Sequence, residues 1–86
     1  MLRITSTHHD GIASLRLEGS LAGMWVEETR TVCAREVELG RRLALDLSEV
    51  RFVDPEGARF LRQMVDAGLV ARSSSYVTEL LRLEGS

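Results

Sequence analysis

The chain has 86 residues, of which 44% are hydrophobic and 28% are charged, and its formal net charge is −2. This composition is ordinary for a soluble domain, and the length is near the lower limit for a chain that folds alone. All eleven basic residues are arginines spread along the chain among thirteen acids, which argues against a nucleic-acid partner.

Neither membrane insertion nor secretion is indicated by the sequence pattern. No apolar run approaches the roughly 20 residues that a bilayer span needs, and the first residues lack the basic-then-apolar order of a signal peptide. The single cysteine, Cys33, cannot form an internal disulfide bond. We therefore expect a cytoplasmic protein with no membrane span.

The chain opens with two segments, 2–7 and 12–18, that alternate apolar and polar side chains and therefore predict β-strands. Between them, Asp10 and Gly11 suit the positive-φ positions of a tight turn, so a hairpin is expected. His8 and His9 lie at its tip. Neighbouring strand residues point to opposite faces, and no recognised ligand spacing accompanies this pair, so a solvated tip is predicted rather than a metal site.

The next segment, 23–39, has the periodicity of an amphipathic helix that ends before Gly40. Its predicted inward stripe consists of Trp25, Val26, Thr29, Val32, Cys33 and Val37. Its predicted outer residues are Glu27, Glu28, Arg30, Arg35, Glu36 and Glu38. Cys33 is then an inert core thiol. Trp25 is interpreted as a core residue, with a half-exposed contact anchor as the alternative.

A third strand is predicted at 43–47, followed by a short apolar step containing Val50, Phe52 and Val53. Asp54 is a natural N-cap, and Pro55 suits the first helical position. The helix that follows is predicted to turn Phe60, Leu61, Met64 and Val65 inward and to close at Gly68.

The last part of the chain predicts a short fourth strand at 69–71 and a third helix at 76–81. Ser73, Ser74 and Ser75 precede that helix, and a cap is the simpler interpretation of them than a phosphorylation site. The fold class is therefore α/β: a mixed, mostly parallel four-stranded sheet opened by a β-hairpin, with three helices.

Residues 43–57, Leu-Ala-Leu-Asp-Leu-Ser-Glu-Val-Arg-Phe-Val-Asp-Pro-Glu-Gly, resemble the centre of a STAS domain, the fold of bacterial anti-sigma-factor antagonists. In that family a strand ending in Asp-Leu is followed by Phe-x-Asp-Ser-Ser-Gly. The Gly-Ser-Leu at 19–21 and the Ser-Ser-Tyr-Val-Thr-Glu-Leu at 74–80 are similar to two further family motifs. The resemblance covers nearly all of 1–86, which is interpreted as a single STAS-like domain.

This resemblance implies a regulatory protein–protein interaction module that binds an anti-sigma factor or kinase. The partner-binding residues it suggests are Val53, Asp54, Pro55, Glu56 and Arg59. Regulatory members are phosphorylated on the serine after the aspartate, and here that position is Pro55, which has no hydroxyl group to accept phosphate. An alternative is a STAS-like accessory domain that binds a nucleotide or lipid, or that serves a transporter complex.

Catalysis is not expected. Asp46, Asp54 and Glu56 are carboxylates that acid–base chemistry would require in one cleft, and the sequence offers no Gly-rich approach or nucleophile beside them. Asp46 is instead expected to pair across strands with Arg16 or Arg3. No cofactor and no metal site are predicted.

One face of the predicted sheet carries polar side chains, namely Arg3, Thr5, Ser14, Arg16 and Glu18. Such a face is either left in water or offered to a partner. Compared with typical members of the family the last strand is missing, which is expected to leave an edge that can pair with another copy, so a homodimer or a larger complex is a further hypothesis.

Overall fold

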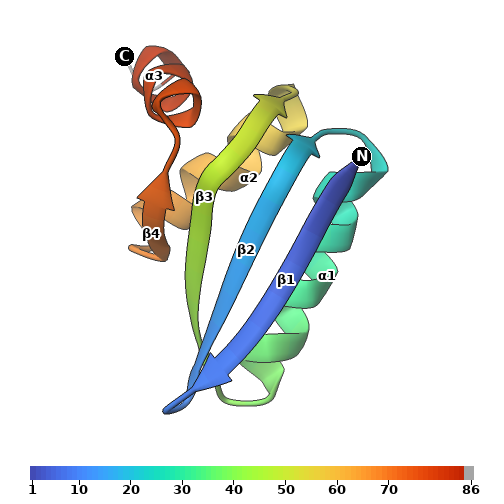
Figure 1. Cartoon of the computed structure of the whole chain (residues 1–86), viewed down its shortest axis with the longest axis vertical. Helices are drawn as coiled ribbons and strands as arrows, with labels where there is room; N and C mark the ends of the chain where they lie inside the picture. Colours follow the sequence, from blue (N-terminus) through green and yellow to red (C-terminus); the bar gives the residue numbers. More distant parts are fainter. Residues whose placement is uncertain (85–86) are drawn as a thin grey trace.

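The computed structural model describes residues 1–84, which form one mixed sheet and the helices packed on it (Figure 1). In chain order the elements of this range are β1 (Leu2–His9), β2 (Ile12–Leu21), α1 (Met24–Glu38), β3 (Arg42–Val53), α2 (Pro55–Asp66), β4 (Val70–Ser73) and α3 (Ser75–Glu84). The strand order is β1-β2-β3-β4, with β1 antiparallel to β2 and the remaining pairs parallel. The predicted fold class is confirmed.

The opening hairpin turns at Asp10 and Gly11, whose φ angles are 52° and 76°. Two positive φ angles match the right-handed twist of the flanking strands, which explains the Asp-Gly pair. Both strands are longer than predicted, because His8 and His9 pair with β2 and the Gly19–Ser20 step stays within β2. At that step Ser20 donates a backbone hydrogen bond to the Met1 carbonyl oxygen at 3.0 Å.

β3 is one long strand and not the two apolar segments that the sequence predicted. Its buried residues are Leu43, Leu45, Leu47, Val50 and Val53. The spacing of these residues is two as far as Leu47 and three in the two steps from Leu47 to Val50 and from Val50 to Val53, where the β2–β3 register shifts. Each irregularity inserts a residue and restores the inward direction of the apolar side chains.

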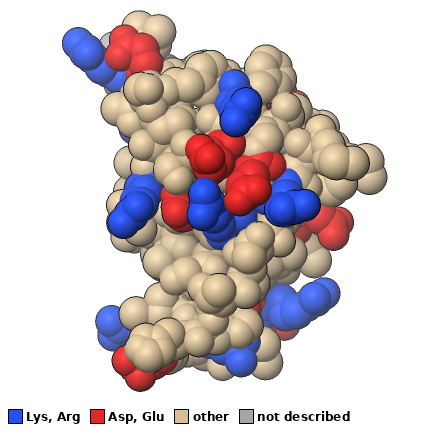
Figure 2. Space-filling view, viewed as in Figure 1, with Lys and Arg blue, Asp and Glu red and all other residues tan. Residues whose placement is uncertain are grey.

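α1 and α2 cover one face of the sheet, and α3 packs against α2 and β3 beyond the end of β4 (Figure 1). The core lies between these layers and is centred on fully buried leucines of β2 and β3 and on Phe60 and Leu61 of α2. The opposite face is uncovered, and charged side chains of both signs gather at its middle (Figure 2). Among the helices described, none is long and apolar enough to span a bilayer.

The ends of the helices agree with the sequence more closely than their faces do. Gly40 and Gly68 follow α1 and α2 with φ angles of 79° and 74°, as expected of residues that close a helix. The predicted inward position of Val37 is wrong, because its side chain is 58% exposed. Val65, also predicted to face inward, is 37% exposed.

The predicted outward position of Glu36 is wrong as well, since this residue is buried. The buried positions of α1 are Val26, Thr29, Cys33 and Glu36. The stripe therefore reaches the last turn on the Glu36 side of the helix and not on the Val37 side. A charged residue is accommodated there because the side chains of His8 and Arg41 reach it, as described below.

Candidate functional site

Asp54 joins the beginnings of two helices at the carboxyl end of the parallel strands. Its Oδ1 accepts a hydrogen bond from the Gly57 backbone N–H at 2.7 Å, and its Oδ2 accepts one from the Gly23 N–H at 2.8 Å. Gly57 lies in the first turn of α2, and Gly23 is the N-cap of α1. These bonds, with that from Gly23 the largest cause, hold the pKa of the Asp54 carboxyl group below its usual range. The predicted N-cap is confirmed, and it has a second partner 31 residues away.

Gly57 brings the start of α2 against the end of β2. A Cβ at this position would lie 2.4 Å from the Leu21 carbonyl oxygen and 2.9 Å from a Val53 methyl carbon. Only glycine permits this approach, because a backbone oxygen cannot move away as a flexible side chain can. Glycine at position 57 thus permits the close approach, and the loop is held there by the Asp54 carboxylate and by the Asp54 N–H, which donates to the Leu21 carbonyl oxygen at 3.2 Å.

The five residues proposed for partner contact differ in exposure, and Asp54 is half-buried with both carboxylate oxygens bonded to backbone N–H groups. Pro55, Glu56 and Arg59 are exposed at the start of α2, and the Glu56 and Arg59 side chains form an ion pair across one helical turn. Val53 is 6% exposed and its side chain packs in the core. Its side chain is therefore not available to a partner in this conformation, whereas Pro55 lies on the surface as the docking hypothesis requires.

Two apolar residues beside this loop were not identified from the sequence as surface residues. Phe52 is 51% exposed and Met24 is 76% exposed. Met24 follows Gly23, which is bonded to Asp54, and Phe52 lies two residues before Asp54 on β3. We call Met24, Phe52, Pro55, Glu56 and Arg59 the loop surface. The available signal was the spacing of three between Val50 and Val53, which turns the intervening Phe52 away from the core.

Tyr76 at the start of α3 supports the same loop. Its hydroxyl oxygen accepts a hydrogen bond from the Val53 backbone N–H at 3.1 Å, while the ring is 39% exposed. Ser74 caps α3: its hydroxyl accepts from the Val77 N–H at 3.2 Å and donates to the Val50 carbonyl oxygen at 3.1 Å. The capping role predicted for these serines is thus confirmed for Ser74, whereas Ser73 ends β4 and Ser75 begins α3.

At the hairpin end of the sheet, the Glu36 carboxylate lies between the side chains of His8 and Arg41. Its Oε2 is 2.7 Å from His8 Nε2, and its Oε1 is 2.6 Å from Arg41 Nη1. The hydrogen bond with His8, followed by that with Arg41, lowers the pKa of the Glu36 carboxyl group. Both histidines are exposed, as predicted for the hairpin tip. His8 also contacts α1 through Glu36, which the sequence did not predict, and His9 lies 3.1 Å from the exposed Asp10.

Cys33 is buried, as predicted, and one turn away from Glu36 on α1. Burial, with a smaller contribution from the Glu36 charge, raises the pKa of its thiol to about 11. The thiolate that a nucleophile requires is thus disfavoured at neutral pH. Trp25 is half-buried and packs against the core, between the two interpretations that the sequence left open.

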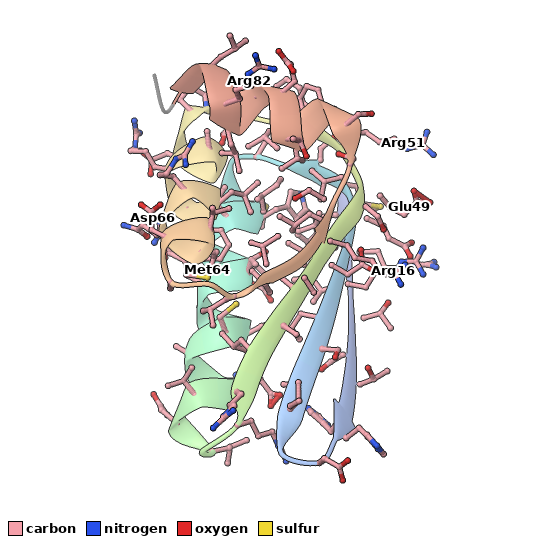
Figure 3. All side chains as sticks on the ribbon, turned by 90° about the vertical axis from the view of Figure 1, so that its left-hand side faces the viewer. Arg16, Glu49, Arg51, Met64, Asp66 and Arg82 are labelled. Atoms are coloured by element: carbon pink, nitrogen blue, oxygen red, sulfur yellow. The ribbon has the colours of Figure 1, made fainter. Side chains whose placement is uncertain are left out.

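The three carboxylates considered for acid–base chemistry have separate partners. Asp46 accepts hydrogen bonds from the Ser48 hydroxyl at 2.6 Å and the Ser48 N–H at 3.0 Å, which lower its pKa. Arg16 lies opposite Asp46 in register, as predicted, and its charge makes a smaller contribution to lowering the pKa of Asp46. Its ion pairs are with Glu18 at 3.2 Å and Glu49 at 3.9 Å. Figure 3 shows Arg16 and Glu49 on the uncovered face, whereas Asp54 binds helix N–H groups and Glu56 pairs with Arg59.

A shallow apolar groove of ≈ 490 Å³ runs between α1 and α2. Its lining comprises Arg30, Cys33, Ala34, Val37, Glu38, Leu43, Phe60, Met64 and Leu69. The Arg30 guanidinium lies 5.2 Å from the centre of the Phe60 ring. Among residues 1–84, no group of three or more histidine, cysteine or acidic side chains is arranged to hold a metal ion.

No protein-family model matches the chain, and no curated protein matches it. The geometry of the loop surface and the sequence motifs around it are therefore the basis on which a function is proposed.

Proposed function

We propose that this protein is a STAS-like protein–protein interaction module of the cytoplasm, resembling an anti-sigma-factor antagonist, that binds its partner through the loop surface. Its partner is an anti-sigma factor or a related kinase. Binding is not switched by phosphorylation at the family position, because Pro55 occupies it.

The observation that carries this proposal is the fixed, exposed loop at the start of α2. Asp54 holds the two helix starts together through its carboxylate, and its backbone N–H donates to the Leu21 carbonyl oxygen at the end of β2, an approach that Gly57 permits. Met24 and Phe52 are exposed apolar residues at the same end of the sheet as the exposed Glu56–Arg59 ion pair, close in sequence to the residues that Asp54 joins. A rigid apolar centre with a charged rim is the usual anatomy of a protein interface.

The loop surface has a permanent and not a switchable charge. Glu56 contributes a single negative charge in the first turn of α2, where a phosphoserine would contribute about −1.5 to −2 with three acceptor oxygens. Arg59 also pairs with Glu56 and neutralises it in part. We infer a constitutive binding surface whose occupancy is set by the concentration of the partner.

The test is affinity capture from an extract of the cells that express the protein, with identification of the captured proteins by mass spectrometry. The variant exchanges the ion pair, Glu56→Arg with Arg59→Glu, which keeps the net charge and the pairing but inverts the charge pattern. We expect the wild type to recover an anti-sigma factor or kinase and the exchange variant to lose it.

A matched control is available on α3, where Glu79 and Arg82 form an ion pair with the same spacing at 3.8 Å. The exchange Glu79→Arg with Arg82→Glu should leave the capture unchanged. Loss of the partner in both variants, or retention in both, would show that the loop surface is not the binding site. Recovery of no anti-sigma factor or kinase by the wild type would remove the proposed partner class.

Binding of a small ligand is a second candidate, and the groove between α1 and α2 is the observation that favours it. Its volume of ≈ 490 Å³ is within the range of ligand sites, and its lining is mostly apolar. A lipid chain suits this lining better than a nucleotide does. A thermal shift with a medium-chain fatty acid, abolished by Ala34→Trp, supports this candidate; a shift with ATP alone argues against this groove.

A further inference from the structure

The last turns of α1 lie beside an open groove. In Figure 1, α1 continues toward the hairpin end of the sheet beyond the point where α2 stops. The groove of ≈ 490 Å³ between the two helices includes Leu43, Leu69 and Met64, the last of which is labelled in Figure 3. Val37 of α1 also lines it and is 58% exposed. An apolar side chain left in water beside an apolar groove indicates a surface that another molecule covers.

The two charged residues of the groove lie at opposite ends of one stripe of α1. Arg30, Ala34 and Glu38 follow one another at intervals of four residues, which places them on one face of the helix. Each charge is therefore about 6 Å from Ala34 along the helix axis. Arg30 also contacts Glu27 at 3.3 Å and Gln63 at 3.3 Å. Glu38 forms no ion pair within residues 1–84, so its charge is open to a partner.

We propose that this face joins two copies of the chain in a symmetric dimer, with the two α1 helices packed antiparallel at Ala34. A two-fold axis there places the Arg30 of one copy opposite the Glu38 of the other, and symmetry repeats the contact. The exposed Val37 of each copy is then covered by the other. The small side chain of Ala34 permits helix axes to approach to roughly 8 Å, the close end of helix packing.

This inference goes beyond the proposed function. The groove face and the loop surface share no residue, so a dimer formed in this way leaves the loop surface of each copy open to its partner.

A fatty acid, the ligand of the second candidate function, matches this groove less completely. Its carboxylate would pair with Arg30 and would leave Glu38 without an opposite charge. A second copy supplies an apolar side chain and both charges at once, because the face is complementary to itself. The two occupants exclude each other, so one set of measurements decides between them.

The test is analytical ultracentrifugation of the purified protein from low micromolar to near-millimolar concentrations. We expect a dimer at the upper concentrations and its loss in Val37→Asp, because the interface would bury a carboxylate without a partner. Val37 is 58% exposed in a single chain, so this variant should fold. The matched control is Glu28→Arg, a charge reversal at an exposed position of α1 outside the groove, which should leave the dimer unchanged.

Two complementary reversals test the pairing itself. Glu38→Arg alone sets two arginines against each other at both contacts, and Arg30→Glu alone sets two glutamates against each other. Each variant should raise the dissociation constant of the dimer about tenfold or more. An equimolar mixture of the two variants has opposite charges at both contacts, so a heterodimer with about the affinity of the wild-type dimer should form. A variant that had merely unfolded could not be rescued in this way.

A monomer at every concentration would overturn the inference, as would a dimer that survives Val37→Asp or a mixture of the two reversals that stays monomeric. A monomer that takes up a medium-chain fatty acid, with amide shifts at Val37 and Met64, would assign the groove to a ligand instead. None of these results depends on the partner captured through the loop surface.

Discussion

The two ends of the sheet each use one carboxylate to join elements that are distant in sequence, but the donors differ. At the carboxyl end, Asp54 binds backbone N–H groups of α1 and α2. At the hairpin end, the buried Glu36 binds the side chains of His8 and Arg41. Backbone donors are fixed by the fold and carry no net charge, so the first junction leaves the surrounding surface free to vary.

This difference bears on function. The Asp54 junction uses backbone donors and leaves the exposed side chains at this end of the sheet free of it. The Glu36 junction instead engages the side chains of its neighbours, His8 and Arg41. A docking surface needs a rigid base that does not itself use the residues that contact the partner. The carboxyl end of the sheet meets this requirement better, which is why we place the binding site there.

The largest expected effect comes from Gly57→Ala, which tests whether the Asp54 junction requires the close approach of α2 to the end of β2. The added Cβ would lie 2.4 Å from the Leu21 carbonyl oxygen. We expect a loss of roughly 3 kcal/mol in the free energy of unfolding, measured with urea. Gly40→Ala is the comparison: its φ of 79° carries strain but nothing lies within 4 Å of the new Cβ, so a loss of about 1 kcal/mol is expected. Equal losses would show that the close contact is not what requires glycine.

Asp54→Ala tests the hydrogen-bonded half of the junction and should cost about 2 kcal/mol, near the upper end for an N-cap, because two backbone N–H groups lose their acceptor. Amide exchange should increase at both Gly23 and Gly57. An increase at Gly57 alone would mean that Asp54 does not hold α1 in solution.

Acidification should weaken both junctions, because folding lowers the pKa of Glu36 from its ordinary value of 4.5 and that of Asp54 from 3.8. The unfolded chain then binds more protons than the folded one. The stabilisation is therefore complete above the ordinary pKa values and is lost as pH falls through the folded ones. When the urea midpoint of unfolding is measured from about pH 7 to about pH 3, the urea concentration at the midpoint should decrease once the pH is below about 4.5.

Replacing either carboxylate separates the two contributions to this acid dependence. Glu36→Gln and Asp54→Asn should each give a shallower fall in stability than the wild type, and Glu36→Gln should act at the higher pH. Asp10→Asn, at an exposed position of the hairpin turn, is the control. A wild-type slope in both variants would contradict the assigned roles.

The sequence predicted those features of the two ends that depend on local chemistry. The Asp-Gly turn and the Asp54 cap follow from φ preferences and from side chains that bind nearby N–H groups. The bond from Asp54 to Gly23 was beyond such reasoning, since it exists only because β2 and β3 end side by side. The inward Glu36 was missed because periodicity assigns charges to the solvent unless their partners are known, and His8 reaches it from 28 residues away.

The sequence predicted only part of the candidate site, because local chemistry was visible in it and strand pairing was not. Pro55, Glu56 and Arg59 are exposed on the first turns of α2, as a helix start after Asp54 implies. Val53 was predicted to contact a partner but is buried, whereas Phe52 was not predicted to do so but is exposed. The β3 irregularities decide which of the two side chains faces the core. Irregularities of this kind depend on pairing between strands and leave only a change of spacing in the sequence.

A small effect on stability is expected from Pro55→Ser, because Pro55 is exposed and occupies the first turn of α2, where no N–H is needed. The loss should be about 0.5 kcal/mol, from greater freedom of the unfolded chain. If the captured partner is a kinase, this variant should accept phosphate from ATP, whereas the wild type should not at this position. Mass spectrometry of the protein after incubation with the kinase and ATP measures phosphate on the variant and on the wild type, and analysis of segment 54–57 locates it. Phosphorylation of the wild type by this kinase at another residue, with loss of binding, would contradict the constitutive surface.

The most direct test of the central claim is an amide shift titration of the isotope-labelled protein with the captured partner. We predict that the largest changes fall on Met24, Phe52, Glu56 and Arg59, and that the Glu56→Arg, Arg59→Glu exchange removes them while its stability stays within about 0.5 kcal/mol of the wild type. Changes centred on the uncovered face around Arg16 and Glu49, with the loop surface unaffected, would contradict the account.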